Sequence, residues 1–170
     1  MRFVSCLVVL CCSRSVGVLA EEQTGIGHND QRVGPSKNYK ELELDTLKKF
    51  RSRSKDSVIV LYGDTCSHCQ QLHPYQEKAA EKVLKKSSNI QFGRIDLWRQ
   101  GEAQLYKKFP DLEPGNVPKA YFISGKDGNA TQIDHEALGW GTHTKLYDWI
   151  KSHTSYPADF EKKKSTKAEL

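Results

Sequence analysis

Residues 57–63, SVIVLYG, form an unbroken run of apolar and β-branched side chains after one serine, and this run restricts the fold more than any other stretch. A strand with one face in water alternates apolar and polar residues. A continuous apolar run of this length is instead typical of a strand buried on both faces. We therefore expect a central strand with other elements packed on either side. Two cysteines, Cys66 and Cys69, follow shortly after it.

The rest of the chain alternates between strand and helix patterns around this run. We expect strands at 40–44, 57–63, 90–96, 119–124 and 130–135, and helices at 45–53, 66–86, 101–109 and 142–153. This order, βαβαβαββα, predicts an α/β fold with a mixed central β-sheet flanked by helices on both faces. Such sheets place their chemistry where strands end and helices begin, and the cysteine pair lies at one such junction.

Capping residues and side-chain periodicity predict how the helices are placed. Asp45 is expected to cap the first helix, and Thr142 or Thr144 the last one. Pro74 is expected to kink the helix at 66–86, because proline lacks the N–H group that a helix needs. The inward face of that helix is predicted to consist of Leu72, Tyr75, Ala79, Ala80, Val83 and Leu84.

The first 20 residues have the pattern of a secretory signal peptide. Arg2 is followed by an apolar run at 3–12 and by small residues that end at Ala20. A membrane anchor is the alternative, but a span needs about 20 apolar residues, and 13–15, SRS, interrupts the run. We therefore divide the chain into a signal peptide at 1–20, a flexible lead-in at 21–38, one domain at 39–154 and a charged tail at 155–170, with no membrane span expected in the mature form.

Removal of residues 1–20 changes the charge and the cysteine count. The whole chain has 26 Lys and Arg against 21 Asp and Glu, a net charge of +5, and loss of Arg2 and Arg14 leaves 24 basic residues and a net charge of +3. This balance is too weak to indicate a nucleic-acid partner. The cysteine count falls from five to two, because Cys6, Cys11 and Cys12 belong to the signal.

Three kinds of site are open to the two cysteines that remain, Cys66 and Cys69. A structural staple is disfavoured, because a disulfide over so short a loop stabilises little. A zinc site needs four ligands, and the only candidates to add are His68 and His73, of which His73 is more simply explained by packing. A redox centre is the third possibility. Haem attachment is excluded, because the residue directly after the second cysteine is Gln.

The ordered set of motifs resembles one family. The strand VIVLYG is followed by CSHC, by Pro74 five residues after the second cysteine, by the helix PYQEKAAEKV, by a Val117–Pro118 step before a strand, and by a last helix after a Gly-containing turn. Over about 39–154 the chain is similar to the thioredoxin-like domains of the protein disulfide isomerase family. The resemblance implies that the cysteine pair cycles between dithiol and disulfide. It also implies that a cis peptide bond precedes Pro118, and that Val117 and Pro118 lie beside the pair and contact substrate.

The start of a helix predicts different roles for the two cysteines. A thiol there faces unpaired backbone N–H groups and the positive end of the helix dipole, which favour a thiolate, so Cys66 is the expected nucleophile. Cys69, one turn deeper, is expected to resolve the mixed disulfide by attacking Cys66. Ser67 and His68 lie between them, and a donating or positively charged His68 stabilises the reduced form and makes the disulfide a better oxidant. The alternative is a solvated His68 that tunes nothing.

Three positions depart from the family pattern. Thr65 stands where the family usually has Trp, and Val60 stands where it often has a buried acid that helps to move the proton of the resolving cysteine. The segment at 139–145, GWGTHTK, lacks the Arg that many isomerases carry before the last helix. Proton transfer at Cys69 is therefore expected to be slow, which impairs isomerisation more than oxidation or reduction.

Two short signals bear on the compartment. The last four residues, 167–170, read KAEL and resemble the luminal retention signal KDEL, which together with the signal peptide predicts the lumen of the endoplasmic reticulum. Secretion follows if KAEL is not recognised, and an ordinary Lys-rich tail is the alternative. Asn129 begins the sequon Asn129-Ala130-Thr131 in a predicted turn and is the candidate glycosylation site.

These observations lead to one main prediction and two alternatives. We expect a thiol–disulfide oxidoreductase of the protein disulfide isomerase type that acts on secretory-pathway client proteins. The expected partners are protein substrates with thiols or disulfides, and a thiol oxidase or glutathione as redox partner; no cofactor and no metal are expected. The alternatives are a binding or chaperone module of the same fold with little turnover, and a zinc-binding structural protein.

Overall fold

The apolar run at 57–63 is a buried strand at the centre of a sheet, as its composition predicts. The computed structural model describes residues 32–51, 54–113 and 115–161, so the predicted signal peptide and the KAEL terminus lie outside the described residues. Strand β2 (Asp56–Tyr62) is buried at all seven positions. It pairs in parallel with β3 (Ile90–Asp96) on one side and antiparallel with β4 (Lys119–Ile123) on the other.

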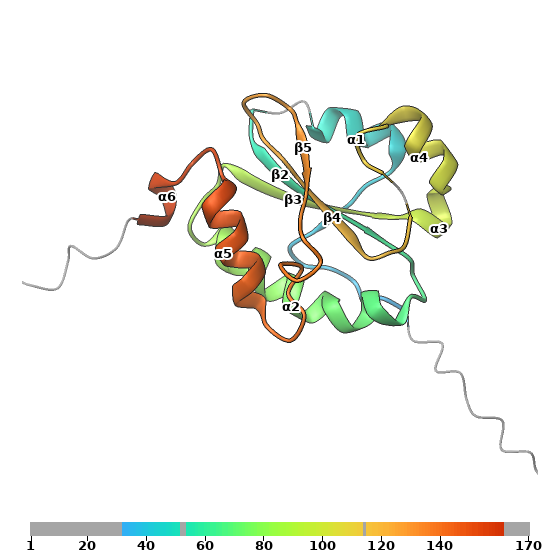
Figure 1. Cartoon of the computed structure of the whole chain (residues 1–170), viewed down its shortest axis with the longest axis horizontal. Coiled ribbons are helices and arrows are strands. Elements are labelled where there is room, and N and C mark those ends of the chain that lie inside the picture. The colour runs from blue at the N-terminus through green and yellow to red at the C-terminus, as the bar shows by residue number, and fades with distance from the viewer. Residues whose placement is uncertain (1–31, 52–53, 114, 162–170) are drawn as a thin grey trace, which may run out of the picture.

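Within the described residues the sheet has five strands in the order β1–β3–β2–β4–β5 (Figure 1). The edge strands are short: β1 (Lys40–Glu41) runs parallel to β3, and β5 (Ala130–Gln132) antiparallel to β4. This mixed sheet confirms the predicted fold class. The register places Val60 between Arg94 on β3 and Ala120 on β4, so that the position without the expected acid adjoins a basic residue.

The described helices are α1 (Leu44–Arg51), α2 (Ser67–Leu84), α3 (Leu97–Gln100), α4 (Glu102–Lys108), α5 (His143–His153) and α6 (Ala158–Glu161). Helices α2 and α5 cover one face of the sheet, and α1, α3 and α4 cover the other (Figure 1). Because alternate residues of β2 point to opposite sides, Val58 and Val60 contribute to the first core, and Ile59 and Leu61 contribute to the second. No helix in the described part of the chain is both long enough and apolar enough to cross a bilayer.

The prediction that Asp45 caps the first helix is wrong. The helix begins one residue earlier, and the Thr46 hydroxyl accepts from the Glu43 N–H at 3.1 Å and donates to the Glu43 carbonyl at 2.9 Å. Asp45 lies in the first turn and pairs with Lys108 of α4 at 2.7 Å instead. The last helix is capped by Thr142, one of the two predicted residues.

Helix α2 follows most of its predicted inward face but differs at three positions. Leu72, Ala79, Ala80 and Val83 are buried as expected, and the helix continues through Pro74. Tyr75, which was predicted to face inward, is only half-buried. Leu84 is 39% exposed, because it is the last residue of α2 and the adjacent Val83 occupies the inward position there. Gln76, which was not predicted to face inward, is only 5% exposed.

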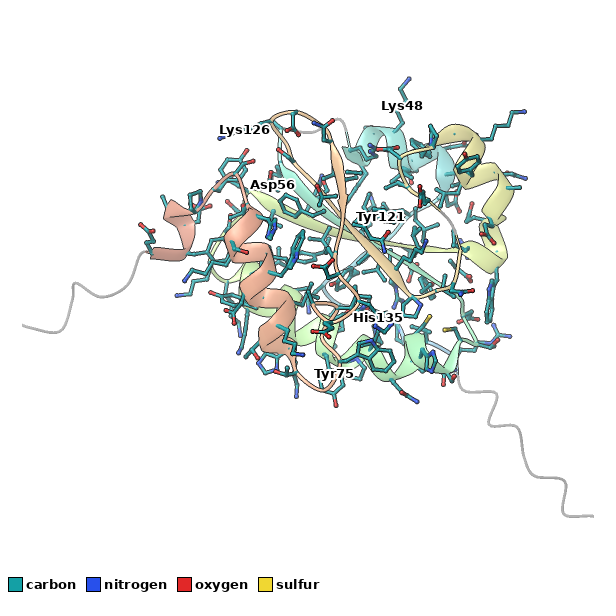
Figure 2. The ribbon with its side chains drawn as sticks, viewed as in Figure 1. Lys48, Asp56, Tyr75, Tyr121, Lys126 and His135 are labelled. Carbon is teal, nitrogen blue, oxygen red and sulfur yellow. The ribbon has the colours of Figure 1, made fainter. Side chains whose placement is uncertain are left out.

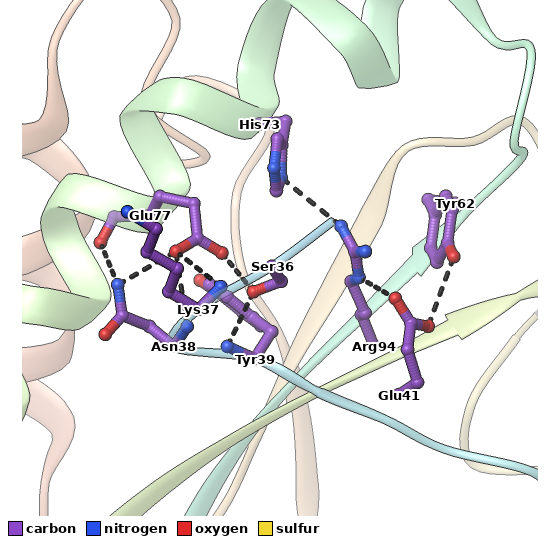
Figure 3. Close-up of polar contacts among 9 residues, drawn as sticks. All are labelled: Ser36, Lys37, Asn38, Tyr39, Glu41, Tyr62, His73, Glu77 and Arg94. Atoms are coloured by element: carbon purple, nitrogen blue, oxygen red, sulfur yellow. Dashed lines mark hydrogen bonds and ion pairs between the residues drawn. The ribbon is translucent and has the colours of Figure 1, made fainter. Parts of the chain in front are cut away.

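The packed structure extends past both ends of the expected domain at 39–154. In the expected lead-in, the Asn38 side-chain amide donates to the Glu77 carboxylate of α2 at 2.8 Å, and Ser36 and Lys37 also bond this carboxylate (Figure 3). In the expected tail, α6 places Phe160 in the core against the ring of Tyr147. Neither contact follows from local periodicity, because each joins segments that are distant in the sequence.

A buried carboxylate ties the start of β2 to two later segments. Asp56, labelled in Figure 2, has no exposed surface. Its two oxygens accept hydrogen bonds from the Gly125 N–H at 2.8 Å, the Thr154 hydroxyl at 2.7 Å and the Ser155 N–H at 2.7 Å. These bonds hold the turn after β4 and the end of α5 to the central strand, which fixes the sheet on which the cysteine pair is mounted.

Candidate active site

Cys66 is the N-cap residue of α2, where the chain leaves the central sheet. Its φ and ψ of −71° and 116° are extended, and its sulfur accepts a hydrogen bond from the Cys69 N–H at 3.2 Å. The N–H groups of a first helical turn have no acceptor within the helix, so they are suited to stabilise an anion. The side chain that accepts this bond is a thiol, which places a nucleophilic atom at the anion-stabilising end of α2.

The Val117–Pro118 step lies beside Cys66. The peptide bond is cis, as the family resemblance implies, and the Cys66 sulfur lies 3.8 Å from the Val117 carbonyl oxygen. Pro118 is buried and lines a cavity next to Cys69, whereas Val117 is half-buried. Of the two residues expected to contact substrate, Val117 is therefore the one with exposed surface next to the Cys66 sulfur.

Cys69 lies beneath Cys66 and differs from it in exposure. Only 3% of Cys69 is exposed, whereas Cys66 is half-buried, and both are free thiols in this structure. Burial, followed by the hydrogen bond to Cys66, raises the pKa of the Cys69 thiol. The Cys69 thiol is therefore protonated at neutral pH. Its burial also keeps it from contact with solvent.

Ser67 and His68 are exposed on the surface between the two cysteines. The His68 ring meets the Trp140 ring edge to face, with centroids 5.5 Å apart. The Trp140 indole N–H in turn points at His135 Nε2 at 3.3 Å, and Figure 2 labels His135 in the loop before α5. His68 is thus held by a group from another part of the chain, a contact for which the sequence pattern gave no signal.

Trp98 packs against the segment that leads into Cys66 and is exposed, whereas Trp140 is half-buried. Trp98 of α3 packs directly on Gly63, where an added Cβ would lie 2.4 Å from the indole ring. The Asp96 carboxylate orients α3 by accepting from the Trp98 N–H at 3.0 Å, and 57% of Trp98 is exposed. Thr65 stands where the family usually has Trp, but α3 brings an indole close to that position in space.

A network of charged and polar side chains surrounds the buried Arg94 (Figure 3), which lines the same cavity as Cys69. Arg94, 6% exposed, pairs with the Glu41 carboxylate, and the Tyr62 hydroxyl donates to the same carboxylate at 3.1 Å. A guanidinium nitrogen of Arg94 lies 3.4 Å from His73 Nδ1. Burial, followed by the positive charge of Arg94, lowers the pKa of His73, so that its ring is neutral at pH 7. The predicted packing role of His73 thus includes a polar contact.

The remaining candidates are distributed away from this network. Asn129 is exposed in the turn between β4 and β5, which leaves its side chain accessible. Among the described residues, no three His, Cys, Asp or Glu side chains are grouped so that they could hold a metal ion. The zinc alternative therefore gains no ligand set from this part of the chain.

Together the fold and the site define a thioredoxin-fold protein with a CxxC pair at the start of α2. The family model for thioredoxin matches residues 39–136, more than half of the chain, and the chain belongs to this family. The predicted resemblance to thioredoxin-like domains of the protein disulfide isomerase family is confirmed.

Curated relatives carry the name of these isomerases. The chain is 28% identical over 128 residues to protein disulfide isomerase-like 1-4 of Oryza sativa subsp. japonica, a match that covers 75% of this chain and 20% of the relative. It is 26% identical over 161 residues to the protein disulfide-isomerase of Drosophila melanogaster, covering 93% of this chain and 28% of that protein. The chain thus spans roughly a fifth to a quarter of the length of these relatives.

Solved structures share the fold. Human ERp44 form I gives a TM-score of 0.57 at 16% identity, over 70% of this chain and 30% of that one. The first thioredoxin domain of mouse protein disulfide-isomerase A4 gives 0.53 at 18% identity, over 88% of this chain and 95% of that domain. At such identities the likeness establishes the architecture, and the activity has to be argued from the site.

Proposed function

We propose that this protein is a thiol–disulfide oxidoreductase of the protein disulfide isomerase type that acts on client proteins of the secretory pathway. The observation that carries the proposal is the asymmetry of the pair. Cys66 is accessible at the N-terminus of α2, and the Cys69 N–H donates to its sulfur at 3.2 Å, whereas Cys69 is buried beneath it. This difference supports a role for Cys66 in attacking a client and a role for Cys69 in displacing it.

The reaction is a pair of sulfur exchanges. In the reducing direction, the Cys66 thiolate attacks one sulfur of a client disulfide, the Cys66–client bond forms, and the second client sulfur leaves as a thiolate. Cys69 loses its proton and attacks Cys66, the disulfide between Cys66 and Cys69 forms, and the client leaves reduced. Oxidation of a client dithiol is the reverse sequence, and a thiol oxidase or glutathione restores the starting state of the pair.

The surroundings of Cys66 offer contacts to a client and a means of tuning. The Val117 carbonyl oxygen lies next to the Cys66 sulfur, and Pro118 is buried. The exposed Trp98 packs on Gly63, three residues before Cys66. Ser67 and His68 are exposed between the cysteines, where a donating His68 would stabilise the reduced pair. Client selection on this model depends on the surface around Val117.

The compartment belongs to the same proposal. The relatives named above are protein disulfide isomerases, and the sequence carries a predicted signal peptide at 1–20 and the KAEL terminus. Proteins with a KDEL-type terminus are retained in the lumen of the endoplasmic reticulum, where the oxidising environment allows disulfides to form. Asn129, in an exposed turn, is the proposed glycan acceptor there.

A second candidate function is a binding module that holds clients with little turnover. It is favoured by Val60, which replaces the expected acid, and by the raised pKa of the buried Cys69 thiol, because both slow the escape of a captured client. In this case a long-lived mixed disulfide at Cys66 would be the functional state.

The test is capture of clients by Cys69→Ser in secretory cells. This variant keeps the attacking sulfur and removes the resolving one, so mixed disulfides that are lost on reduction should accumulate. Cys66→Ser and the double variant are the matched controls and should trap nothing. A wild-type protein that traps as much as Cys69→Ser supports the binding module, and no trapped protein with any variant contradicts both functions.

A further inference from the structure

A small cavity lies on the inner side of Cys69. Its walls include Cys69 and Gln76 of α2, Tyr39 from the segment before β1, Val60 of β2 and Arg94 of β3. About 10 Å³ of it is open to the centre of a water molecule. This is close to the smallest volume that holds one water, provided that the walls offer at least two polar partners.

Two polar atoms in the walls lack partners. Tyr39 Oη and Gln76 Nε2 are fully buried, and neither has a hydrogen-bond partner among the described residues. The two side chains are each 5% exposed. An unpartnered buried donor is costly, so such groups in native proteins usually bond an internal water. Tyr39, Gln76 and Cys69 all line the same cavity, so one water there would have two donors and the Cys69 sulfur around it.

The helix brings these groups together. Cys69, His73 and Gln76 are four and three residues apart, a spacing that puts them on one face of α2. Tyr39 enters from the opposite wall, where its ring meets Phe92 edge to face at 5.2 Å. Burial raises the pKa of the Tyr39 hydroxyl, which therefore stays protonated and able to donate.

The other groups around the cavity are poor acceptors for the Cys69 proton. Val60 is apolar, and Arg94 is a permanent cation with no lone pair to offer. His73 Nδ1 faces the Arg94 guanidinium, and the ring also bonds the Pro35 backbone, so both of its polar positions are engaged. The nearest carboxylates in this network, Glu41 and Glu77, are engaged by Arg94 and by the segment at 36–38.

We propose that this cavity binds one water molecule, which accepts hydrogen bonds from Tyr39 Oη and Gln76 Nε2 and donates one to the Cys69 sulfur, and that this bond promotes loss of the Cys69 proton when Cys69 resolves a mixed disulfide. The proton passes to a base in the solvent, and the water stabilises the thiolate that remains. The Cys69 sulfur then bonds to Cys66, the bond from Cys66 to the client breaks, and the client sulfur leaves with the electron pair and takes a proton from solvent. The positive charge of Arg94 stabilises the transient thiolate. The catalytic step rests on the proposed function, whereas the water site does not.

The kinetic test uses reduced protein and oxidised glutathione, followed by acid quenching and mass spectrometry. Attack by Cys66 depends on the glutathione concentration, and closure by Cys69 does not, so the two steps separate. Tyr39→Phe and Gln76→Leu should each slow closure about tenfold at neutral pH, the equivalent of one hydrogen bond, and leave the first step unchanged. The defect should shrink at high pH, where hydroxide removes the proton directly.

Tyr121→Phe is the matched control, because the Tyr121 hydroxyl bonds the Glu113 carbonyl on the opposite face of the sheet, and it should leave both steps unchanged. Closure at the wild-type rate in both cavity variants would overturn the proton role. A wild-type protein whose Cys66 never reacts with glutathione would overturn the proposed function together with this catalytic step.

The water site has its own test. A crystal structure of the reduced protein should show one ordered water within hydrogen-bond distance of Tyr39 Oη and Gln76 Nε2. If the cavity is wet, Tyr39→Phe should lower the Tm, because a satisfied bond is lost; if it is dry, removal of an unpartnered hydroxyl should raise it. A dry cavity with a raised Tm would overturn the water site and its catalytic role together.

Discussion

The backbone N–H of Cys69 donates a hydrogen bond to the sulfur of Cys66 at 3.2 Å. This contact places the two thiols in different surroundings although they are three residues apart. Cys66 accepts a hydrogen bond at the start of a helix and is partly exposed, whereas Cys69 is buried and lines a cavity. The proposed sequence of attack by Cys66 and resolution by Cys69 is based on this difference.

Alkylation of the reduced, native protein should therefore modify Cys66 before Cys69. Exposure and thiolate character both control thiol reactivity, and the Cys69 thiol is 3% exposed with a raised pKa, so we expect a difference of at least about tenfold. Iodoacetamide labelling with peptide mass spectrometry measures it. Unfolding in denaturant is the control and should make the two rates similar. Equal rates in the native protein would contradict the assigned roles.

Asp56→Ala should destabilise the fold by about 3 kcal/mol, because it removes an acceptor of three hydrogen bonds and leaves buried donors unpaired. Urea denaturation gives the free energy of unfolding. Asp127→Ala is the control: Asp127 is exposed and accepts from the Asn129 N–H at 3.0 Å, so its loss should cost less than about 1 kcal/mol. A similar cost for both would show that the Asp56 network contributes little.

His73 should make stability fall in mild acid. Its pKa is lowered in the folded protein by burial and by Arg94, against smaller opposing effects of Glu77, the Pro35 backbone and Glu41. The unfolded chain therefore takes up a proton below about pH 6.5 before the folded chain does, and stability present above that pH is lost as the pH falls. His73→Gln should lose less stability between pH 7 and pH 5 than the wild type. The same loss in both would rule out this contribution.

His68→Ala tests whether the residue between the cysteines tunes the pair. If His68 stabilises the reduced form, its removal should lower the reduction potential by about 30 mV, a tenfold change in the equilibrium with glutathione. His153→Ala is the control, because His153 lies at the end of α5 and stacks on Trp149, and it should leave the potential unchanged. An unchanged potential in His68→Ala would support the solvated alternative.

Local pattern was sufficient for much of the fold. The apolar run at 57–63 and the Thr142 cap were predictable because strand burial and helix capping depend on neighbouring residues. The strand-to-helix junction at Cys66 was predictable for the same reason. The wrong predictions at Asp45 and Leu84 concern helix ends. Asp45 pairs with Lys108 of another helix, and Leu84 lies at the last residue of α2, where the side chain is exposed.

The parts of the site that were missed all come from distant segments. Trp98 reaches Gly63 from α3, and Trp140 reaches His68 from the loop before α5, through contacts that no periodicity encodes. Gln76 is absent from the predicted inward face of α2, since buried glutamine is uncommon, and only the fold shows that it lines a cavity. The substitution at Val60 was visible in the sequence, but the groups around it were not.

The reduction potential of the Cys66–Cys69 pair, measured by equilibration with defined ratios of reduced and oxidised glutathione, tests the central claim most directly. The account predicts one two-electron transition between dithiol and internal disulfide, at a potential above the value of about −270 mV that is typical of thioredoxin. A protein that forms no internal disulfide at any ratio, or that stops as a mixed disulfide with glutathione at Cys66, would contradict it.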